Sequence, residues 1–320
     1  MDHEKIFFFE VEDDDKKKVK DRFPKAQIFD QNINQIKNSD DYQNAEIICV
    51  FIYSKLSKDV LQKMKNLKLI ITRSVGYDHI DLEICKALGI KVCNVPDYGS
   101  HVIAEHVFAL LLSGLRHIDE ADKRVEVKNN FNFHGLRGMA LQGKTIGIIG
   151  VGKIGVNVAR IASSGFLMNV LAYAPHQDQE KALRNHFKYV DLDQIWSESD
   201  IISLHCPLLD STKHLINKNV ISKMKDGVII VNTSRGGIIN TSDLVIGIKS
   251  GKISNVFLDV LEHEKELEKD KELIEIPGVI TTPHIAFYAD DSMNRMYNEA
   301  MDSIFRYLED EELIHEIVGI

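Results

Sequence analysis

Cysteine, proline and tryptophan are scarce in this chain of 320 residues, which has four cysteines, six prolines and one tryptophan. The cysteines are Cys49, Cys85, Cys93 and Cys206, and no pair of them has Cys-x-x-Cys spacing. Few, dispersed cysteines favour reduced thiols in a cytoplasmic protein over a disulfide scaffold or a zinc site. We therefore expect a cytoplasmic location and no bound metal.

Long apolar runs and an excess of positive charge are also missing. No apolar stretch approaches the roughly 20 residues of a membrane-spanning helix, and the charged residues 1–25 lack the apolar core of a secretory signal. Lysine and arginine number 39 against 48 aspartate and glutamate residues, a net charge of −9. This balance disfavours a broad surface for nucleic acid or anionic membrane, so we expect neither as a partner.

Apolar runs of strand length alternate with helical segments along almost the whole chain. With 44% hydrophobic and 27% charged residues, the composition is that of an ordinary globular protein, and the length suits two domains. Most runs are nearly continuous, as expected for strands that helices cover on both faces. The alternation predicts a doubly wound α/β fold with parallel sheets. The predicted strands are Lys5–Val11, Ala45–Ile52, Leu67–Ser74, Ile90–Val95, Thr145–Gly150, Asn169–Ala174, Ile201–Cys206, Gly227–Ser234, Ser254–Val260 and Val279–Thr282.

Two segments have the composition of domain boundaries. Pro, Asp, Gly and Ser cluster in Asn94–Ser100, which precedes a predicted helix with apolar residues at helical spacing, Ile103–Arg116. The second segment, Pro283–Ala289, follows the last strand and precedes a predicted helix, Asp291–Leu308. We infer a middle domain inserted between an N-terminal half-domain and a returning C-terminal helix. The polar stretch Arg124–Arg137 is expected to be an irregular connection or an oligomer contact.

A strand that begins at Thr145 runs into a Gly-x-Gly-x-x-Gly motif, and a segment of helical propensity, Val156–Ser163, follows it. Gly150 permits the tight turn, Gly152 lets the backbone approach a pyrophosphate, and Gly155 permits close packing of helix and strand. The helix N-terminus adds free N–H groups and a partial positive charge for the phosphates. In this context the motif predicts a dinucleotide site.

The next strand ends without the acidic residue that usually binds the ribose hydroxyls of NAD, about 20 residues after the glycines. Tyr173 and Ala174 stand there, followed by Pro-His-Gln, and no arginine is present to bind a 2′-phosphate. The sequence therefore predicts NAD as the cofactor, with NADP also accepted and weak discrimination between the two. Asp178 is the alternative acid if the turn is longer.

Further segments resemble one family in order and spacing. Together with the glycine motif, they make the chain similar to the D-isomer-specific 2-hydroxyacid dehydrogenases over essentially its full length. Tyr98 favours the D-lactate dehydrogenase-like members over the phosphoglycerate-type members. The matching segments are Arg73–Asp81, Asn94–Gly99, Ala104–His106, Leu204–Leu208, Val231–Gly236, Leu258–Glu264 and Thr282–Ile285.

The resemblance implies a Rossmann dinucleotide-binding domain inserted in a flavodoxin-like substrate domain. We place the substrate domain at residues 1–99 and 287–320, and the NAD(P)-binding domain at residues 100–286. The implied activity is hydride transfer between NAD(P)H and a 2-keto acid or D-2-hydroxy acid, of the D-lactate type. A glyoxylate, hydroxypyruvate or phosphoglycerate dehydrogenase, and a dinucleotide-sensing regulatory protein on the same fold, are the alternatives.

Reduction of a 2-keto acid needs a clamp for the carboxylate, a proton donor for the forming alkoxide and a hydride source. The resemblance assigns the clamp to Arg235, whose planar charged fork suits a carboxylate. It assigns the proton donor to His284, since imidazole can give and take a proton near neutral pH. Glu264 is the expected partner that holds the imidazole and favours its protonated form. Glu262 is the competing candidate, and His263 between them is expected to be solvated.

The remaining site residues also follow from the resemblance. Backbone N–H groups of the glycine motif would bind the pyrophosphate, and Asp259 would accept from the nicotinamide carboxamide unless it caps a helix. Backbone N–H groups of Val75 and Gly76 would bind the substrate carboxylate, and Tyr98 would line that pocket. The implied cofactor-binding residues are Gly150, Gly152, Lys153, Ile154, Gly155, Tyr173, Ala174, Cys206, Pro207, Thr212, Thr233, Ser234, Arg235 and Asp259.

A homodimer is the expected assembly. The apolar-striped helix Ile103–Arg116, with the polar segment after it, resembles the region through which members of the family pair. A helix of this kind can also pack inside one subunit, and that alternative stays open. The expected partners are a small 2-keto or 2-hydroxy acid and a second copy of the chain.

Overall fold

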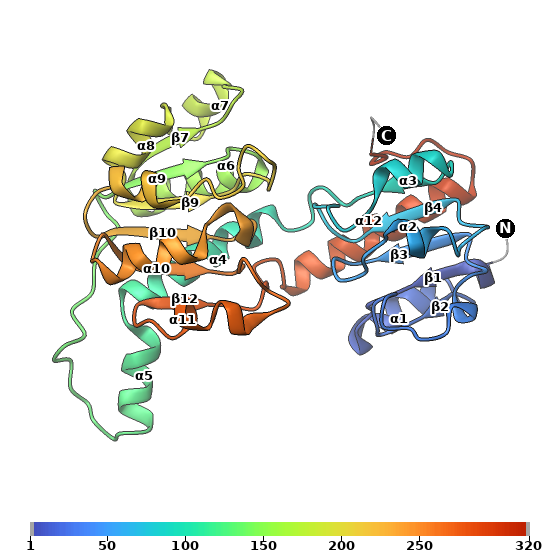
Figure 1. The fold of residues 1–320 in the computed structure, drawn as a ribbon, viewed down its shortest axis with the longest axis horizontal. Coiled ribbons are helices and arrows are strands. Elements are labelled where there is room, and N and C mark those ends of the chain that lie inside the picture. Colours follow the sequence, from blue (N-terminus) through green and yellow to red (C-terminus); the bar gives the residue numbers. More distant parts are fainter. Residues whose placement is uncertain (1–2, 318–320) are drawn as a thin grey trace. The chain divides into compact units, whose positions relative to one another are not determined.

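The computed structural model describes residues 3–317 and divides the chain into two compact units. Unit 1 comprises the chain up to Gly99 and from Ala289 onward, and unit 2 comprises Ser100–Tyr288. Each unit is built around its own parallel β-sheet with helices packed against it, as the ribbon in Figure 1 shows. The chain thus leaves unit 1 once, forms unit 2, and returns.

The sheet of unit 1 has five parallel strands in the order β2-β1-β3-β4-β5. This is the flavodoxin-like order, in which strands are added first to one side of β1 and then to the other. The elements are β1 (Ile6–Phe8), α1 (Asp13–Arg22), β2 (Gln27–Ile28), β3 (Ile47–Val50), α2 (Lys58–Leu61), β4 (Leu69–Thr72), α3 (Leu82–Ala87), β5 (Lys91–Cys93) and α12 (Asp290–Leu308).

The C-terminal helix α12 completes unit 1. It packs against β4 and α1, and its Phe305 ring stacks on Phe23 with 4.7 Å between centroids. Phe7 of β1 and Ile48 of β3 belong instead to a buried cluster that includes Leu61 of α2. Strand side chains alternate between faces, so helices from both ends of the chain are needed to bury this sheet.

The sheet of unit 2 has seven parallel strands in the order β12-β11-β10-β9-β6-β7-β8. This is the Rossmann order extended by one strand, with the reversal of strand order between β6 and β9. The elements are α4 (Ser100–Leu115), α5 (Ile118–Glu126), β6 (Thr145–Ile149), α6 (Lys153–Arg160), β7 (Asn169–Tyr173), α7 (Gln179–Arg184), β8 (Lys188–Tyr189), α8 (Leu192–Glu198), β9 (Ile201–Leu204), α9 (Lys218–Lys223), β10 (Val228–Asn232), α10 (Thr241–Lys249), β11 (Ile253–Leu258), α11 (Lys271–Ile274) and β12 (Val279–Thr281).

Helices bury both faces of the unit 2 sheet. Ile148 of β6 lies in one buried cluster with Val107 of α4 and Val158 of α6. The next residue, Ile149, lies in a second cluster with Leu244 of α10. Because both faces are covered, these strands carry the continuous apolar runs seen in the sequence. The carboxyl ends of the strands are the edge at which ligands bind in such sheets.

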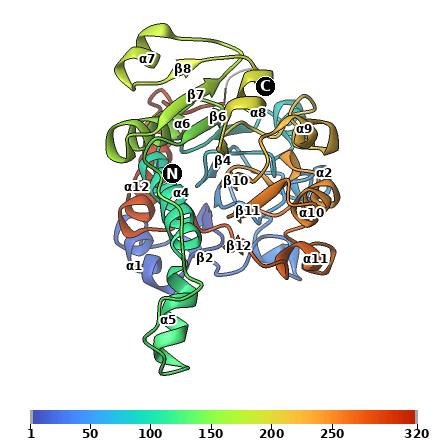
Figure 2. The ribbon, with the colours of Figure 1, turned by 90° about the vertical axis from the view of Figure 1, so that its left-hand side faces the viewer.

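One part of unit 2 extends away from its sheet. Figures 1 and 2 show α5 and the loop after it reaching beyond the body of the unit. No side chain of α5 is buried, and Phe131 and Phe133 of the loop are 96% and 79% exposed. We call residues 118–140 the arm. Part of the stretch expected to be irregular, Arg124–Arg137, is therefore helical, because α5 continues to Glu126.

The structure confirms the doubly wound α/β fold, and every strand expected from an apolar run is present, although most are shorter. Two strands were not predicted. β2 and β8 are two residues long and lie at sheet edges, where one side of the strand is open and no continuous apolar run is required. Helix α6 also begins earlier than expected, at Lys153, directly after the glycine loop.

Within residues 3–317, no helix is both long enough and apolar enough to cross a bilayer. The same residues hold no group of three or more His, Cys, Asp or Glu side chains arranged to bind a metal ion. All four cysteines are free and buried.

Candidate active site

The glycine loop joins β6 to α6. Gly150 has a φ of +96°, and a Cβ there would lie 2.6 Å from the His205 carbonyl oxygen, so glycine is required. A Cβ at Gly155 would lie 2.0 Å from the Gly150 oxygen, whereas one at Gly152 would meet no atom within 4 Å. Gly152 precedes the first turn of α6. Open space at a helix N-terminus suits a pyrophosphate.

The four residues directly after β7, from Ala174 to Gln177, offer no carboxylate to a ribose. Ala174 is partly buried and packs against the apolar core, and the Tyr173 carbonyl accepts from the Gly150 N–H at 2.9 Å. The alternative acid, Asp178, caps α7 by accepting from the Lys181 N–H at 2.9 Å. Its carboxylate therefore already has a structural partner.

The segment after β9 forms a turn of its own. The Thr212 hydroxyl donates to the Pro207 carbonyl at 2.6 Å and accepts from the Leu209 N–H at 2.8 Å. Burial raises the pKa of the Cys206 thiol to about 11, so this thiol is protonated at neutral pH and packs as a small apolar group.

An asparagine that sequence analysis did not single out shapes the end of β10. The buried Asn232 side chain accepts from the Ser234 N–H and donates to the Arg235 carbonyl, both at 2.9 Å. The Ser234 hydroxyl in turn donates to the Cys206 carbonyl at 2.5 Å. Asn232 lies inside the matching segment Val231–Gly236, and that segment was the available signal. Its amide fixes the turn from which Arg235 projects.

Thr233 and Arg235 are the side chains that this turn presents. The Thr233 hydroxyl is buried and has no hydrogen-bond partner within residues 3–317. Arg235 is partly exposed, and its Nη1 donates to the Ser234 carbonyl at 2.9 Å. After Arg235 the chain runs close to the next loop, because a Cβ at Gly236 would lie 1.9 Å from the Leu261 oxygen.

Asp259 follows β11 and is 1% exposed. Its carboxylate accepts from the Thr282 hydroxyl at 2.6 Å and from the N–H groups of Ile285 and Ala286 at 2.8 and 2.9 Å. Its carbonyl accepts from the His284 N–H at 2.8 Å. Asp259 therefore fixes the loop of His284, a supporting role in addition to the cofactor contact that the sequence predicts.

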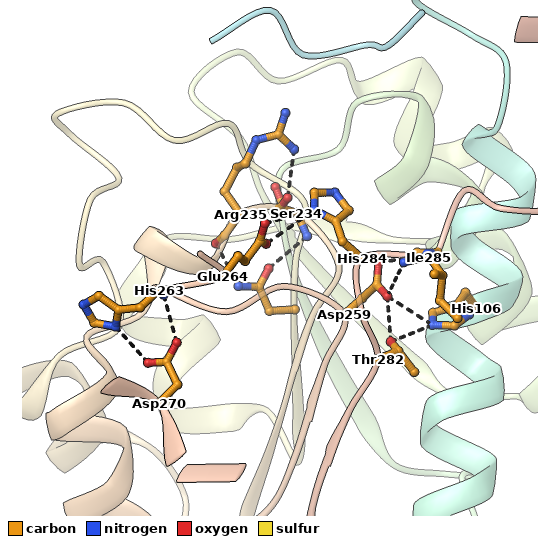
Figure 3. Close-up of polar contacts among 12 residues, drawn as sticks. His106, Ser234, Arg235, Asp259, His263, Glu264, Asp270, Thr282, His284 and Ile285 are labelled. Carbon is orange, nitrogen blue, oxygen red and sulfur yellow. Dashed lines mark hydrogen bonds and ion pairs between the residues drawn. The ribbon is translucent and has the colours of Figure 1, made fainter. Parts of the chain in front are cut away.

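His106 of α4 joins this network, as Figure 3 shows. Its Nε2 lies 3.2 Å from the Thr282 hydroxyl oxygen and 3.6 Å from Asp259. Because the Thr282 hydroxyl donates its hydrogen to Asp259, we assign the neutral His106 a proton on Nε2, which donates to Thr282. Burial lowers the pKa of His106, and the Asp259 carboxylate only partly opposes this effect.

Glu264 and His284 face each other in Figure 3. The His284 Nδ1 lies 3.3 Å from one Glu264 carboxylate oxygen and 3.4 Å from the other. His284 has a φ of +57°, a left-handed conformation that is uncommon for residues other than glycine. With Nδ1 turned toward the carboxylate, Nε2 is the nitrogen that remains for a substrate.

The structure separates the two acidic candidates. Glu262 accepts from the His214 ring at 2.5 Å and from the Thr241 N–H at 2.9 Å. Although burial opposes the shift, these two donors lower the pKa of Glu262. Glu262 thus points to α10 and the segment before α9, and Glu264 is the carboxylate beside His284.

One expectation for this loop is wrong. His263 is not simply solvated, because its ring Nδ1 and its backbone N–H both bond the buried carboxylate of Asp270, each at 2.8 Å. The two residues are separated by a stretch of charged residues that gives no sign of the pairing.

Three of the four predicted substrate-binding residues lie in unit 1, and the fourth, Arg235, lies in unit 2. Val75 and Gly76 follow β4 in an exposed turn, held by an Asn94 amide on the Val75 carbonyl and a Ser74 hydroxyl on the Gly76 carbonyl. Within residues 3–317, their backbone N–H groups make no hydrogen bond. Tyr98 is buried, and its carbonyl accepts from the Ser292 hydroxyl of α12.

The unit 2 residues fit a dinucleotide on two structural grounds. Space is open above Gly152 at the start of α6, and the buried Thr233 hydroxyl at the end of β10 lacks a partner within residues 3–317. Both lie at the carboxyl edge of the sheet. A glycine cradle for phosphates and a buried donor at the same edge are what such a cofactor requires.

Comparisons with known proteins place the chain in a family. A family model described as D-isomer specific 2-hydroxyacid dehydrogenase, NAD binding domain, matches residues 108–286. The D-lactate dehydrogenase of Escherichia coli is 36% identical over 287 residues, which cover 85% of this chain and 86% of that protein. An aromatic 2-oxoacid reductase of Clostridium sporogenes is 40% identical over 254 residues, covering 75% of this chain and 76% of that protein.

A solved structure agrees. D-lactate dehydrogenase from Aquifex aeolicus, complexed with NAD and lactic acid, matches with a TM-score of 0.90 and 34% identity, over 98% of this chain and 99% of that chain. The family model covers the unit that carries the glycine loop, Arg235, Glu264 and His284. The family predicted from the sequence segments is thereby confirmed: the chain belongs to the D-isomer-specific 2-hydroxyacid dehydrogenases, which are oxidoreductases with an NAD-binding domain.

Proposed function

We propose that this protein reduces a short 2-keto acid to the D-2-hydroxy acid, with pyruvate and D-lactate as the natural pair. One observation carries the proposal: the Glu264–His284 pair and Arg235 lie at the carboxyl edge of the sheet that holds the glycine loop. The solved relative complexed with NAD and lactic acid supports the choice of a lactate-type substrate.

Arg235 binds the substrate carboxylate. Its guanidinium is always charged and offers a planar fork of N–H donors. The two hydrogen bonds of the Asn232 side chain hold the backbone at Arg235. In unit 1, the backbone N–H groups of Val75 and Gly76 and the side chain of Tyr98 are proposed as substrate-binding groups.

His284 supplies the proton. NADH, when bound, would supply the hydride for the keto carbon. His284 holds a proton on Nε2 and gives it to the keto oxygen as negative charge develops there. Glu264 orients the ring through Nδ1. Hydrogen bonds to Asp259 hold the backbone at His284 and the next two residues, and so keep His284 in its left-handed conformation.

The remaining unit 2 residues are proposed to hold the cofactor. The N–H groups of Lys153 and Ile154 at the start of α6 bind the pyrophosphate, and Thr233, Ser234 and Asp259 orient the nicotinamide. Cys206 and Pro207 flank the adenosine side, with Thr212 nearby.

Cofactor choice depends on Ala174. Without a carboxylate there, the protein loses a charge-assisted bond to the ribose of NAD and also the repulsion of a 2′-phosphate, so we infer weak discrimination between NADH and NADPH. A charge-assisted bond contributes about 1.5–3 kcal/mol, so Ala174→Asp should raise the NADH over NADPH ratio in kcat/KM at least tenfold. A preference of more than a thousandfold for NADH in the unmodified protein would contradict this reading.

We also propose a cytoplasmic homodimer in which the arm contacts a second copy. Phe131 and Phe133 of the arm are exposed, and no residue of α5 is buried. Exposed apolar side chains of this kind support the assembly. Light scattering is expected to give twice the 36.3 kDa chain mass. Replacing both phenylalanines by glutamate should shift that mass toward the monomer.

A panel of 2-keto acids tests the activity. Pyruvate, phenylpyruvate, 2-ketoisocaproate, glyoxylate and hydroxypyruvate are each supplied with NADH and with NADPH, and cofactor oxidation is followed by the absorbance of the reduced nicotinamide. We expect pyruvate to give the highest kcat/KM. The Clostridium relative, an aromatic 2-oxoacid reductase, makes phenylpyruvate the second candidate. Absence of turnover with every substrate would favour a regulatory protein on this fold.

A further inference from the structure

A partly buried His–carboxylate pair, His263 and Asp270, lies in the loop that carries Glu264. Asp270 is 0% exposed, and within residues 3–317 His263 is the only residue that bonds its carboxylate. The backbone N–H of His263 donates to one oxygen and the ring Nδ1 to the other, each at 2.8 Å. Figure 3 shows this pair next to the segment of Glu264.

The bond pattern fixes both the backbone and the side chain of one residue. An ionised carboxylate only accepts hydrogen bonds, so His263 donates twice. A buried carboxylate without such donors is strongly disfavoured, and the pair is therefore held in place by the cost of separating it. Glu264 is the next residue along the chain, so its position follows from that of His263.

Glu264 has little else to hold it. Its side chain is 40% exposed, and its contacts with the His284 ring are 3.3 and 3.4 Å, too long to restrain an exposed side chain firmly. On the other side of His263, Glu262 is anchored to His214 and the Thr241 N–H. The loop is thus secured at the two residues that precede Glu264.

We propose that His263 and Asp270 are positioning residues that hold Glu264 against His284. The proposal rests on the proposed function, since it gives His263 and Asp270 an indirect part in proton transfer. Neither residue touches the substrate or the reacting atoms in this proposal. Their effect on turnover passes through Glu264 alone.

A double-mutant cycle tests this dependence. Misplacing a catalytic contact by about 1 Å costs up to about 100-fold, so we expect His263→Leu to lower kcat for pyruvate reduction about tenfold. His263→Asn keeps a donor near the position of Nδ1 and should restore most of that loss. In a Glu264→Gln background, His263→Leu should lower kcat by less than about twofold. An equal loss in both backgrounds would overturn the proposal.

The same substitution at two aspartates, one buried and one exposed, provides the control. Asp270→Asn replaces an acceptor oxygen of the buried group by a donor and is expected to mimic His263→Leu. Asp226→Asn makes the same chemical change at an exposed residue whose carboxylate pairs with Lys252, and it should leave kcat unchanged. If the two variants lower kcat to the same extent, the His263–Asp270 pair does not position Glu264.

Hydrogen exchange of the full-length protein separates failure of this proposal from failure of the proposed function. The amides of His263 and Glu266 are hydrogen-bonded within the loop, so His263→Leu should speed exchange in peptides covering residues 260–270 at least tenfold, and His263→Asn should not. This readout needs no activity. Unchanged exchange in His263→Leu would overturn the proposal, whereas an inactive wild-type protein with the expected exchange would overturn only the assigned reaction.

Discussion

Asp259 and Glu264 belong to the same loop after β11, yet their surroundings are opposite. Asp259 is buried and accepts three short hydrogen bonds, whereas Glu264 is 40% exposed and makes only long contacts with the His284 ring. Asp259 fixes the backbone at His284 through its carbonyl and just after His284 through its carboxylate, and Glu264 faces the His284 ring. Rigid support and an adjustable proton-transfer pair are thus divided between two acids.

This division makes opposite predictions for the two carboxylates. Substitutions of Glu264 or of its partner His284 should change turnover and spare stability, because these two side chains have few structural contacts. Substitutions in the buried network should change stability first, because each lost partner leaves a buried polar group unpaired.

The largest effect is expected for His284→Gln. Loss of a positioned proton donor should lower kcat for keto-acid reduction by about 10²–10⁴, with little change in the free energy of unfolding. Steady-state kinetics and urea unfolding measure the two quantities. Arg235→Lys provides the comparison, since it should raise KM as well as lower kcat, because an ammonium does not reproduce the bidentate fork. Near-normal turnover in His284→Gln would show that another group supplies the proton.

The next effect is expected for Asp259→Ala. The N–H groups of Ile285 and Ala286 and the Thr282 hydroxyl would lose their acceptor, at about 1–3 kcal/mol for each buried group left unpaired. We expect the free energy of unfolding to fall by about 3 kcal/mol or more, measured by urea unfolding. Asp226→Ala at an exposed site should leave it almost unchanged. Equal stability of the two variants would mean that the loop finds other partners.

The contrast between the two acids also explains what the sequence could predict. The apolar runs predicted the strands of both sheets except β2 and β8, and the glycine motif predicted the loop before α6, because each depends on residues that are adjacent in the chain. The partners of Asp259 come from another strand end, at Thr282 and Ile285, and no local pattern announces them. Only the family resemblance brought these segments together.

Buried pairing was the feature that sequence analysis missed. His263 stands among charged residues and so was expected to be solvated, but the chain folds back to place Asp270 against it. The edge strands β2 and β8 were missed for a related reason, since parallel pairing with β1 and β7 defines them. In both cases the structure depends on a contact that forms only on folding, and no local sequence pattern predicts that contact.

The smallest effect concerns His106 and appears only in the pH dependence of stability. Burial lowers the pKa of His106 in the folded protein below its ordinary value of 6.5, so in acid the unfolded chain takes up this proton first. The free energy of unfolding should therefore fall as pH decreases below about 6.5. His106→Gln retains an N–H donor for Thr282 but does not titrate, so urea unfolding between pH 7.5 and about 5.5, the range around the ordinary histidine value, should show a flatter dependence. The change in slope should stay under about 1.4 kcal/mol per pH unit, the limit for one proton. A steeper loss of stability in the variant would mean that His106 is charged in the folded protein and forms a true ion pair with Asp259.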